Sequence, residues 1–237
     1  MSFVVYAHRG ASEYAPENTF SSFYLGCQMG ANGIETDVRR TRDGVPVLFH
    51  DDTLKRVTGN DGSIGDYTYS ELSEMRVRNS KTGTEDIIVR LEDYLHYFGF
   101  RKLRFAIELK EEGLEKDVID LLDAYGMREK TVITSFCFDY LANVKKLCPD
   151  FRTGYLADDF DENKTDMMSA IGGEELCPKA SRVTGDKVKY WHGLGFNVRA
   201  WGVTNTDLMR SAYESGVDGM TVNFPDLLIS YIGGRTE

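Results

Sequence analysis

Residues 3–10 have the sequence FVVYAHRG and residues 33–37 have the sequence GIETD, and these two stretches decide how the chain can fold. Each contains a short apolar run that predicts a buried strand ending in charged side chains. Side chains alternate along a strand, so Glu35 and Asp37 are expected on the same face. Two buried carboxylates are costly unless a divalent cation, an arginine or a lysine pairs them. The alternative is that one carboxylate faces solvent at the strand end.

A predicted hairpin brings a histidine to the same place. Asp43-Gly44 separates two extended runs, which favours a two-residue type I′ turn. With that turn Arg42 faces Val45, and His50 lies opposite Asp37. Directly opposite residues have Cβ atoms about 5 Å apart. The inference depends on register, because a slip of one residue moves the histidine to the other face.

Strands and helices alternate along the whole chain and predict a (β/α)8 TIM barrel. An open doubly wound sheet is the alternative, but no glycine-rich dinucleotide fingerprint follows a strand. We expect one domain, residues 1–237, with a loop-dominated insertion on the barrel rim at about residues 51–90, after the second strand. That insertion contains one short capped helix at 70–75. The eight strands are expected to begin near residues 3, 33, 103, 131, 152, 174, 197 and 217. Helices are expected over residues 16–29, 91–98, 114–125, 138–147, 182–194, 207–214 and 225–231, with an unassigned polar stretch up to residue 171.

Polar residues collect at the carboxyl ends of the predicted strands, where barrels build their active sites. Three carboxylates there form an all-oxygen set that suits Mg²⁺ or Ca²⁺ better than Zn²⁺. Two cations suit a phosphate group, and two histidines titrate near neutrality as acid–base catalysis requires. The residues are Glu35, Asp37 and Glu108, then Arg9 and Lys110, then His8 and His50.

Together these groups predict metal-assisted cleavage of a phosphoester. The alternative is that His8 and Glu35 form a buried ion pair that caps the barrel. Trp201 ends another predicted strand and either packs in the core or holds an alcohol or glycerol group.

The composition limits the partners. The chain has 237 residues, 41% of them hydrophobic, and a net charge of −10, which argues against a nucleic-acid or anionic-membrane binder. No apolar run approaches the roughly 18 residues of a membrane span. The four cysteines have no metal-binding or disulfide spacing, which fits a reducing compartment, and we expect a cytoplasmic protein without a stable membrane anchor.

The order of the motifs resembles the glycerophosphodiester phosphodiesterase family, in its bacterial, cytoplasmic type. The resemblance spans nearly the whole chain. It is carried by His8-Arg9-Gly10, Pro16-Glu17-Asn18-Thr19, Glu35-Thr36-Asp37, His50-Asp51, Glu108-Leu109-Lys110 and residues 201–205, WGVTN.

The resemblance implies a TIM barrel that hydrolyses glycerophosphodiesters to sn-glycerol 3-phosphate and an alcohol. It implies one divalent cation on Glu35, Asp37 and Glu108, His8 and His50 as the acid–base pair, and Arg9 and Lys110 on the phosphate. Attack by water or by a glycerol hydroxyl, which would give a cyclic phosphate, both stay open.

Two positions need separate treatment. Glu17 is expected to support His8 or Arg9. Asn223 stands where members of the family often carry an aspartate.

A phospholipase-like enzyme acting on intact or lyso-phospholipids is the alternative activity, and would need an apolar rim. A barrel that only binds or regulates is a further alternative.

Overall fold

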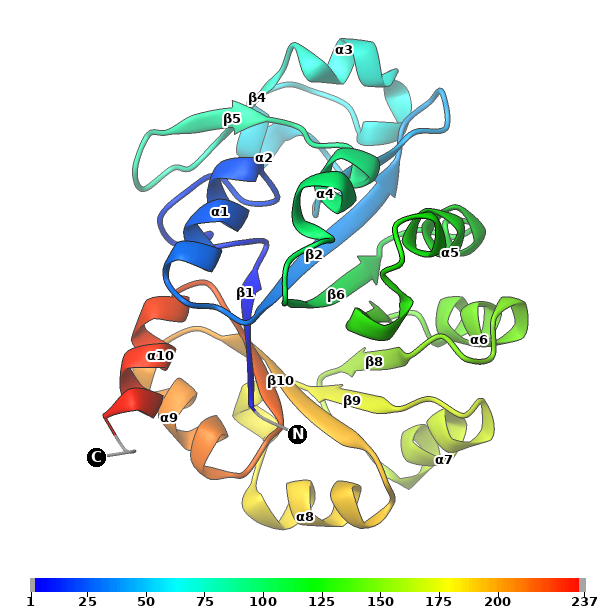
Figure 1. The fold of residues 1–237 in the computed structure, drawn as a ribbon, viewed down its shortest axis with the longest axis vertical. Helices are drawn as coiled ribbons and strands as arrows, with labels where there is room; N and C mark the ends of the chain where they lie inside the picture. Colours follow the sequence, from blue (N-terminus) through cyan, green and yellow to red (C-terminus); the bar gives the residue numbers. More distant parts are fainter. Residues whose placement is uncertain (1–2, 235–237) are drawn as a thin grey trace.

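Eight parallel strands form a closed barrel in this computed structural model, which describes residues 3–234. Each strand pairs with the next in chain order, and β1 closes the ring by pairing with both β2 and β11 (Figure 1). The predicted TIM barrel is therefore confirmed. The barrel strands are β1 (Val4–His8), β2 (Gly33–Arg40), β6 (Arg104–Leu109), β7 (Thr131–Ser135), β8 (Thr153–Ala157), β9 (Glu175–Pro178), β10 (Asn197–Val203) and β11 (Gly219–Val222).

The helices lie outside the strands and bury one face each against them (Figure 1). They are α1 (Phe20–Gln28), α4 (Leu91–Phe98), α5 (Glu115–Ala124), α6 (Phe138–Leu147), α7 (Glu162–Ala170), α8 (Gly185–Gly193), α9 (Thr206–Glu214) and α10 (Pro225–Gly233). Short 3₁₀ turns, Arg128–Lys130 and Ala180–Arg182, precede β7 and α8.

Helix α7 lies in the stretch that the sequence left unassigned. It buries only Thr165 and Met168, so it lacks the apolar stripe that marks the other helices. Its start carries the signal that was available: Asp161 caps the helix by accepting a hydrogen bond from the Lys164 N–H at 2.9 Å.

The hairpin that follows β2 differs from the prediction by one residue. Strand β3 (Pro46–Leu48) pairs with β2 so that Val38 faces Leu48, not the Phe49 that the predicted turn requires. The loop has three residues, 42–44, and ends at Gly44 with φ 85°, which is the bulged turn that follows two-residue turns in frequency. Asp37 therefore faces Phe49, and His50 lies beyond the end of the strand, so the predicted Asp37–His50 pairing is wrong.

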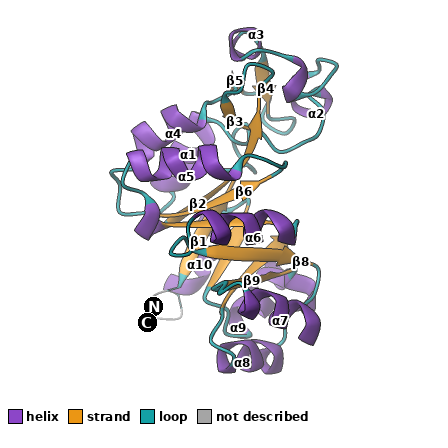
Figure 2. Ribbon diagram, turned by 90° about the vertical axis from the view of Figure 1, so that its right-hand side faces the viewer, coloured by secondary structure: helices purple, strands orange, loops and turns teal. Residues whose placement is uncertain are grey.

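Residues 51–90 lie between β3 and α4, after the second barrel strand, at the top of Figure 2. The insertion contains more structure than loops: α2 (Lys55–Thr58), a 3₁₀ turn (Ile64–Asp66), α3 (Tyr69–Ser73), and a hairpin of β4 (Arg76–Arg78) and β5 (Glu85–Ile87). It has a small apolar cluster of its own, which includes Leu54, Ile64, Leu72, Val77 and Ile88. The three-residue strands were too short to produce a periodic signal in the sequence.

The inside of the barrel contains an apolar cluster and a buried ion pair. Tyr6, Ala106 and Val132 form an apolar cluster there. Arg199 Nε lies 2.7 Å from Glu175 Oε1, and both side chains are almost fully buried. None of the helices in residues 3–234 is long and apolar enough to cross a membrane.

Candidate active site

Strand register brings the predicted carboxylates together at the carboxyl end of the barrel. His8 of β1 lies beside Glu35 of β2, and Asp37 of β2 lies beside Glu108 of β6. One oxygen from each of Glu35, Asp37 and Glu108 lies within 4.8 Å of the others, and all three residues are buried. Such a cluster of oxygen atoms is the kind of site that binds a hard divalent cation.

The electrostatics of these carboxylates fit a cation. Burial, together with Asp37 and Glu108, raises the pKa of Glu35 well above its ordinary value. Burial and the charge of Asp37 raise the pKa of Glu108 to about 7. The Oδ1 atom of Asp37 is buried and accepts no hydrogen bond from the described residues. The carboxylates therefore repel one another and leave one oxygen without a hydrogen bond, and a divalent cation would relieve both conditions.

Two cations flank this cluster. Arg9 Nε lies 3.1 Å from Asp37 Oδ2, and Lys110 Nζ lies 2.7 Å from Glu108 Oε1 and 3.4 Å from Asp37 Oδ1. Burial alone would raise the pKa of Asp37, but Arg9 and Lys110 hold that pKa below its usual range. The backbone at Arg9 and Gly10 is left-handed, with φ 55° and 81°. This tight turn directs the Arg9 side chain back toward β2.

His8 has a neutral partner. Its Nδ1 lies 2.6 Å from the Asn223 Oδ1 atom, so with the amide oxygen facing it this nitrogen donates, and Nε2 is left without a proton. Burial and the charge of Arg9 lower the pKa of His8 to about 3. Its Nε2 lies 3.8 Å from Glu35 Oε2. A neutral imidazole does not form the charged pair with Glu35 that the alternative interpretation required.

His50 has a charged partner and belongs to a chain of ion pairs. Its Nδ1 donates to Asp51 Oδ1 at 2.7 Å. Arg56 of α2 binds Asp51 through Nε at 2.6 Å and Glu17 through Nη1 at 2.8 Å. Glu17 in turn accepts from Arg9 Nη1 at 2.8 Å. Glu17 thus contacts Arg9, one of its two expected partners, and the insertion is linked to both ends of the site.

The sequence interpretation did not single out Arg56 or Asn18 as functional. Asn18 donates to Asp37 Oδ2 at 2.8 Å and accepts from the Thr36 hydroxyl at 2.7 Å. It lies in the Pro16–Thr19 motif, which was a usable signal. Arg56 gave no such signal, because its partners lie 5 and 39 residues away in the sequence.

A cavity of about 200 Å³ opens at this end of the barrel. Both histidines, Arg9, Glu35 and Glu108 line it, while Asp37 and Lys110 contact lining residues. Its opposite wall contains Phe136 and Trp201, whose rings meet edge to face at 4.9 Å. Trp201 is partly exposed, and its Nε1 donates to the Ala157 carbonyl at 3.1 Å. The wrong hairpin register therefore did not alter the outcome, since His50 still lies beside the cavity.

A parallel barrel with acidic, basic and imidazole groups at its carboxyl end is the architecture of a TIM-barrel hydrolase. A family model described as the glycerophosphoryl diester phosphodiesterase family matches residues 8–227. The chain belongs to this family of enzymes.

Named relatives and solved structures agree with that assignment. A glycerophosphodiester phosphodiesterase of Bacillus altitudinis is 30% identical, over 94% of this chain and 95% of the relative. One of Caldanaerobacter subterraneus subsp. tengcongensis is 28% identical, over 98% of each chain. The crystal structure of an Oleispira antarctica phosphodiesterase in complex with the product sn-glycerol-3-phosphate superimposes with a TM-score of 0.88, 28% identity and coverage of 97% and 96%.

Proposed function

We propose that this protein is a metal-dependent phosphodiesterase that hydrolyses glycerophosphodiesters to sn-glycerol 3-phosphate and an alcohol. The observation that carries the proposal is that three buried carboxylates, two cations and two histidines meet beside one cavity. The product bound to the Oleispira antarctica enzyme supports the same substrate class here. We also propose that the chain is a single barrel domain in which residues 51–90 form an insertion on the rim.

Glu35, Asp37 and Glu108 would hold one divalent cation, Mg²⁺ or Ca²⁺, because the set offers only oxygen ligands. A cation bound there would polarise the phosphoryl oxygens and stabilise the charge that develops on them. Asn18 keeps Asp37 in place through the hydrogen bond from its amide.

Arg9 and Lys110 provide positive charge for the phosphate group. Arg9 lines the cavity, and Lys110 contacts the lining residue Glu108. Trp201, on the opposite wall, would contact the glycerol or alcohol part of the substrate.

The different partners of the two histidines support different roles. His8, beside the neutral amide of Asn223, stays unprotonated and suits the role of general base. His50, beside the Asp51 carboxylate, has a partner that stabilises its protonated form and suits the general acid that protonates the leaving alcohol. Burial, together with the charges of Arg9 and Lys110, lowers the pKa of His50, and Asp37 and Asp51 oppose that effect.

The phospholipase-like alternative gains no support. It requires an apolar rim, and the large exposed apolar side chains of the described residues include none from residues 51–90. Phe136 is such a residue beside the cavity, but one ring is less than a bilayer-binding surface requires.

The test is release of sn-glycerol 3-phosphate from glycerophosphocholine and glycerophosphoethanolamine with Mg²⁺, Ca²⁺ or EDTA. We expect metal-dependent release that falls at least a hundredfold in His50→Ala. His96→Ala is the matched control, because His96 is exposed on α4 outside the cavity. Equal activity of His50→Ala and His96→Ala would overturn the acid role, and full activity after EDTA treatment would overturn the metal dependence.

A further inference from the structure

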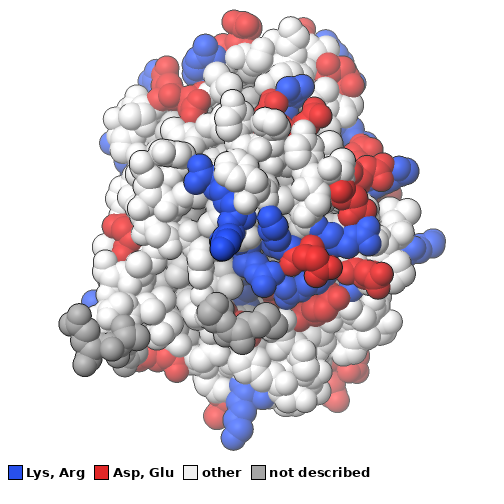
Figure 3. Space-filling model, in the orientation of Figure 1, with Lys and Arg blue, Asp and Glu red and all other residues white. Residues whose placement is uncertain are grey.

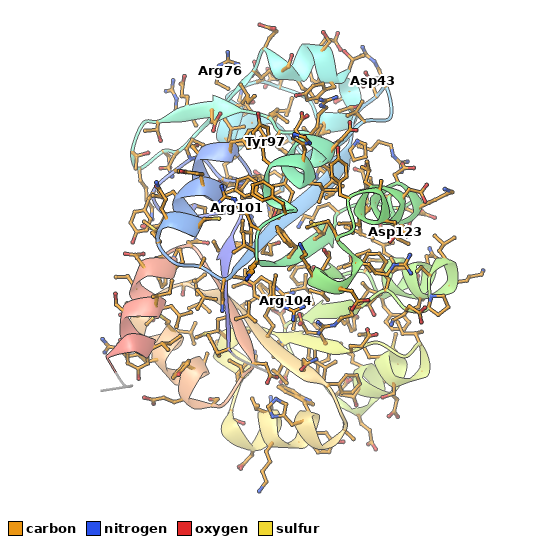
Figure 4. The ribbon with its side chains drawn as sticks, viewed as in Figure 1. Asp43, Arg76, Tyr97, Arg101, Arg104 and Asp123 are labelled. Carbon is orange, nitrogen blue, oxygen red and sulfur yellow. The ribbon has the colours of Figure 1, made fainter. Side chains whose placement is uncertain are left out.

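The barrel has a second polar opening at the end opposite the candidate active site. Four cations, Lys102, Arg104, Lys130 and Arg152, line a hollow of about 730 Å³, which we call the basal hollow. They sit at or just before the first residues of β6, β7 and β8, so they lie at the amino ends of three consecutive strands. Figure 3 shows basic side chains near the centre of this face, with acidic side chains beside them, and Figure 4 labels Arg104 there.

Among the described residues, these four cations lack carboxylate partners and line one hollow together. Other cations of the chain pair closely with acids, for example Arg90 with Asp93 and Lys187 with Asp159, both at 2.7 Å. Within residues 3–234, no carboxylate lies within 4.0 Å of the side-chain nitrogens of Lys102, Arg104, Lys130 or Arg152.

Backbone carbonyls position two of the four cations. Arg104 donates to the Glu129 carbonyl at 2.8 Å, and Lys130 donates to the Gly99 carbonyl at 2.7 Å. A carbonyl oxygen orients a cation but does not neutralise its charge.

The acidic residues near the basal hollow do not offset this charge. Glu129 is the one carboxylate that lines it among the described residues. A smaller cavity, also lined by Arg104 and Arg152, reaches Glu175 and Asp218. Glu175 already binds Arg199 at 2.7 Å, and Asp218 accepts hydrogen bonds from His192 and the Val198 N–H, each at 2.8 Å. Four positive charges and one negative charge line the hollow, although the chain as a whole has a net charge of −10. This local excess of positive charge attracts an anion.

We propose that the basal hollow binds a small molecule that carries two or more phosphate groups, at a site separate from the catalytic one. Arginine presents a planar fork that matches a phosphate, and two arginines and two lysines provide partners for more than one phosphate. A volume of about 730 Å³ is in the range of small-molecule sites. The concave shape favours a soluble anion over the flat surface of a lipid bilayer.

The test uses sodium tripolyphosphate as the probe, in isothermal titration calorimetry with EDTA at 0.15 M NaCl. We expect saturable binding of one molecule per chain. Arg104→Ala/Arg152→Ala should raise the dissociation constant at least tenfold. The same double variant should leave hydrolysis of glycerophosphocholine in Mg²⁺ unchanged. Lys146→Ala/Lys189→Ala, which removes the same charge from exposed positions on α6 and α8, should change binding less than twofold.

Three results would overturn the proposal. The first is an absence of saturable binding at millimolar probe, including the case in which only phosphatidylglycerol vesicles bind. The second is equal weakening in both double variants, which would mean a long-range effect of net charge. The third is binding that Lys110→Ala abolishes and Arg104→Ala/Arg152→Ala does not, which would place the probe in the catalytic site. If the first double variant fails to fold by circular dichroism, Lys102→Ala/Lys130→Ala replaces it with the same expected result.

Discussion

Arg56→Ala tests the chain of ion pairs that links the insertion to the candidate active site. Arg56 hydrogen-bonds Glu17 at 2.7 and 2.8 Å and Asp51 at 2.6 and 2.9 Å. Glu17 holds Arg9, and Asp51 holds His50. Removing the guanidinium leaves both carboxylates with one fewer partner and frees two groups that must be aligned for the reaction.

The size of the effect follows from the geometry and exposure of the side chain. A hydrogen bond to a charged group contributes about 1.5–3 kcal/mol when it is shielded from water. Because the Arg56 side chain is half exposed, at 50%, we expect a loss of only about 1–2 kcal/mol in the free energy of unfolding. Misalignment of Arg9 and His50 should lower kcat about 10- to 100-fold, which corresponds to about 1.4–2.7 kcal/mol of activation free energy.

The assay is steady-state release of sn-glycerol 3-phosphate, with kcat and KM determined separately between pH 5 and 9. Arg56→Lys should recover only part of kcat, because a single ammonium cannot bridge two carboxylates as a guanidinium does. Lys55→Ala is the control, since Lys55 lies on the same short helix and, among the described residues, pairs only with the exposed Asp61. The reasoning is refuted if Arg56→Ala has a kcat within twofold of Lys55→Ala, or if Arg56→Lys is no more active than Arg56→Ala.

Three further predictions concern stability. Burial would raise the pKa of Asp51, but hydrogen bonds from the neighbouring arginine and histidine lower it to about 2. The ionised Asp51 side chain therefore stabilises the fold by at most about 2 kcal/mol, an effect that is present above pH 4 and lost as pH falls through 2. In urea titrations, the free energy of unfolding of Asp51→Asn should fall less steeply below pH 4 than that of the wild type, and identical slopes would contradict this. Gly10→Ala should lower the free energy of unfolding by about 3 kcal/mol, because a Cβ would lie 2.4 Å from a backbone carbon of α1. Gly44→Ala, with a similar φ and nothing within 4 Å, should lower it by about 1 kcal/mol. Equal losses in urea unfolding would count against the steric argument. Glu175→Gln should lower the free energy of unfolding by about 3–5 kcal/mol because it leaves a buried guanidinium without its carboxylate. The double variant Arg199→Met/Glu175→Leu should recover most of that loss, measured as Tm. A double variant no more stable than the single one would show that the pair itself stabilises the barrel.

The strand and helix pattern was visible in the sequence because each element carries a local signal. Apolar runs mark the barrel strands, and helices such as Leu91–Phe98 and Phe138–Leu147 follow the predicted bounds. Helix α7 was missed where the apolar stripe fails, and the hairpin of β4 and β5 was missed because three-residue strands have no periodicity.

The candidate site was predictable to the extent that it depends on strand ends. Alternation along β2 places Glu35 and Asp37 on one side, and closure of any parallel barrel brings Glu108 beside them. His50 was placed for the wrong reason, since the loop is one residue longer than predicted. The error was harmless because His50 follows the strand on a segment that the insertion holds against the cavity.

The sequence by itself determined the barrel, the residue types at its carboxyl end and the family, because periodicity and motif order are local properties of a chain. Only the tertiary structure decided which side chains from distant parts of the sequence pair with one another. Arg56 bridges Glu17 and Asp51 over 39 and 5 residues, and four cations at the amino ends of three strands converge on the basal hollow. Such contacts depend on how the barrel closes and how the insertion folds over it, and no short-range pattern records either.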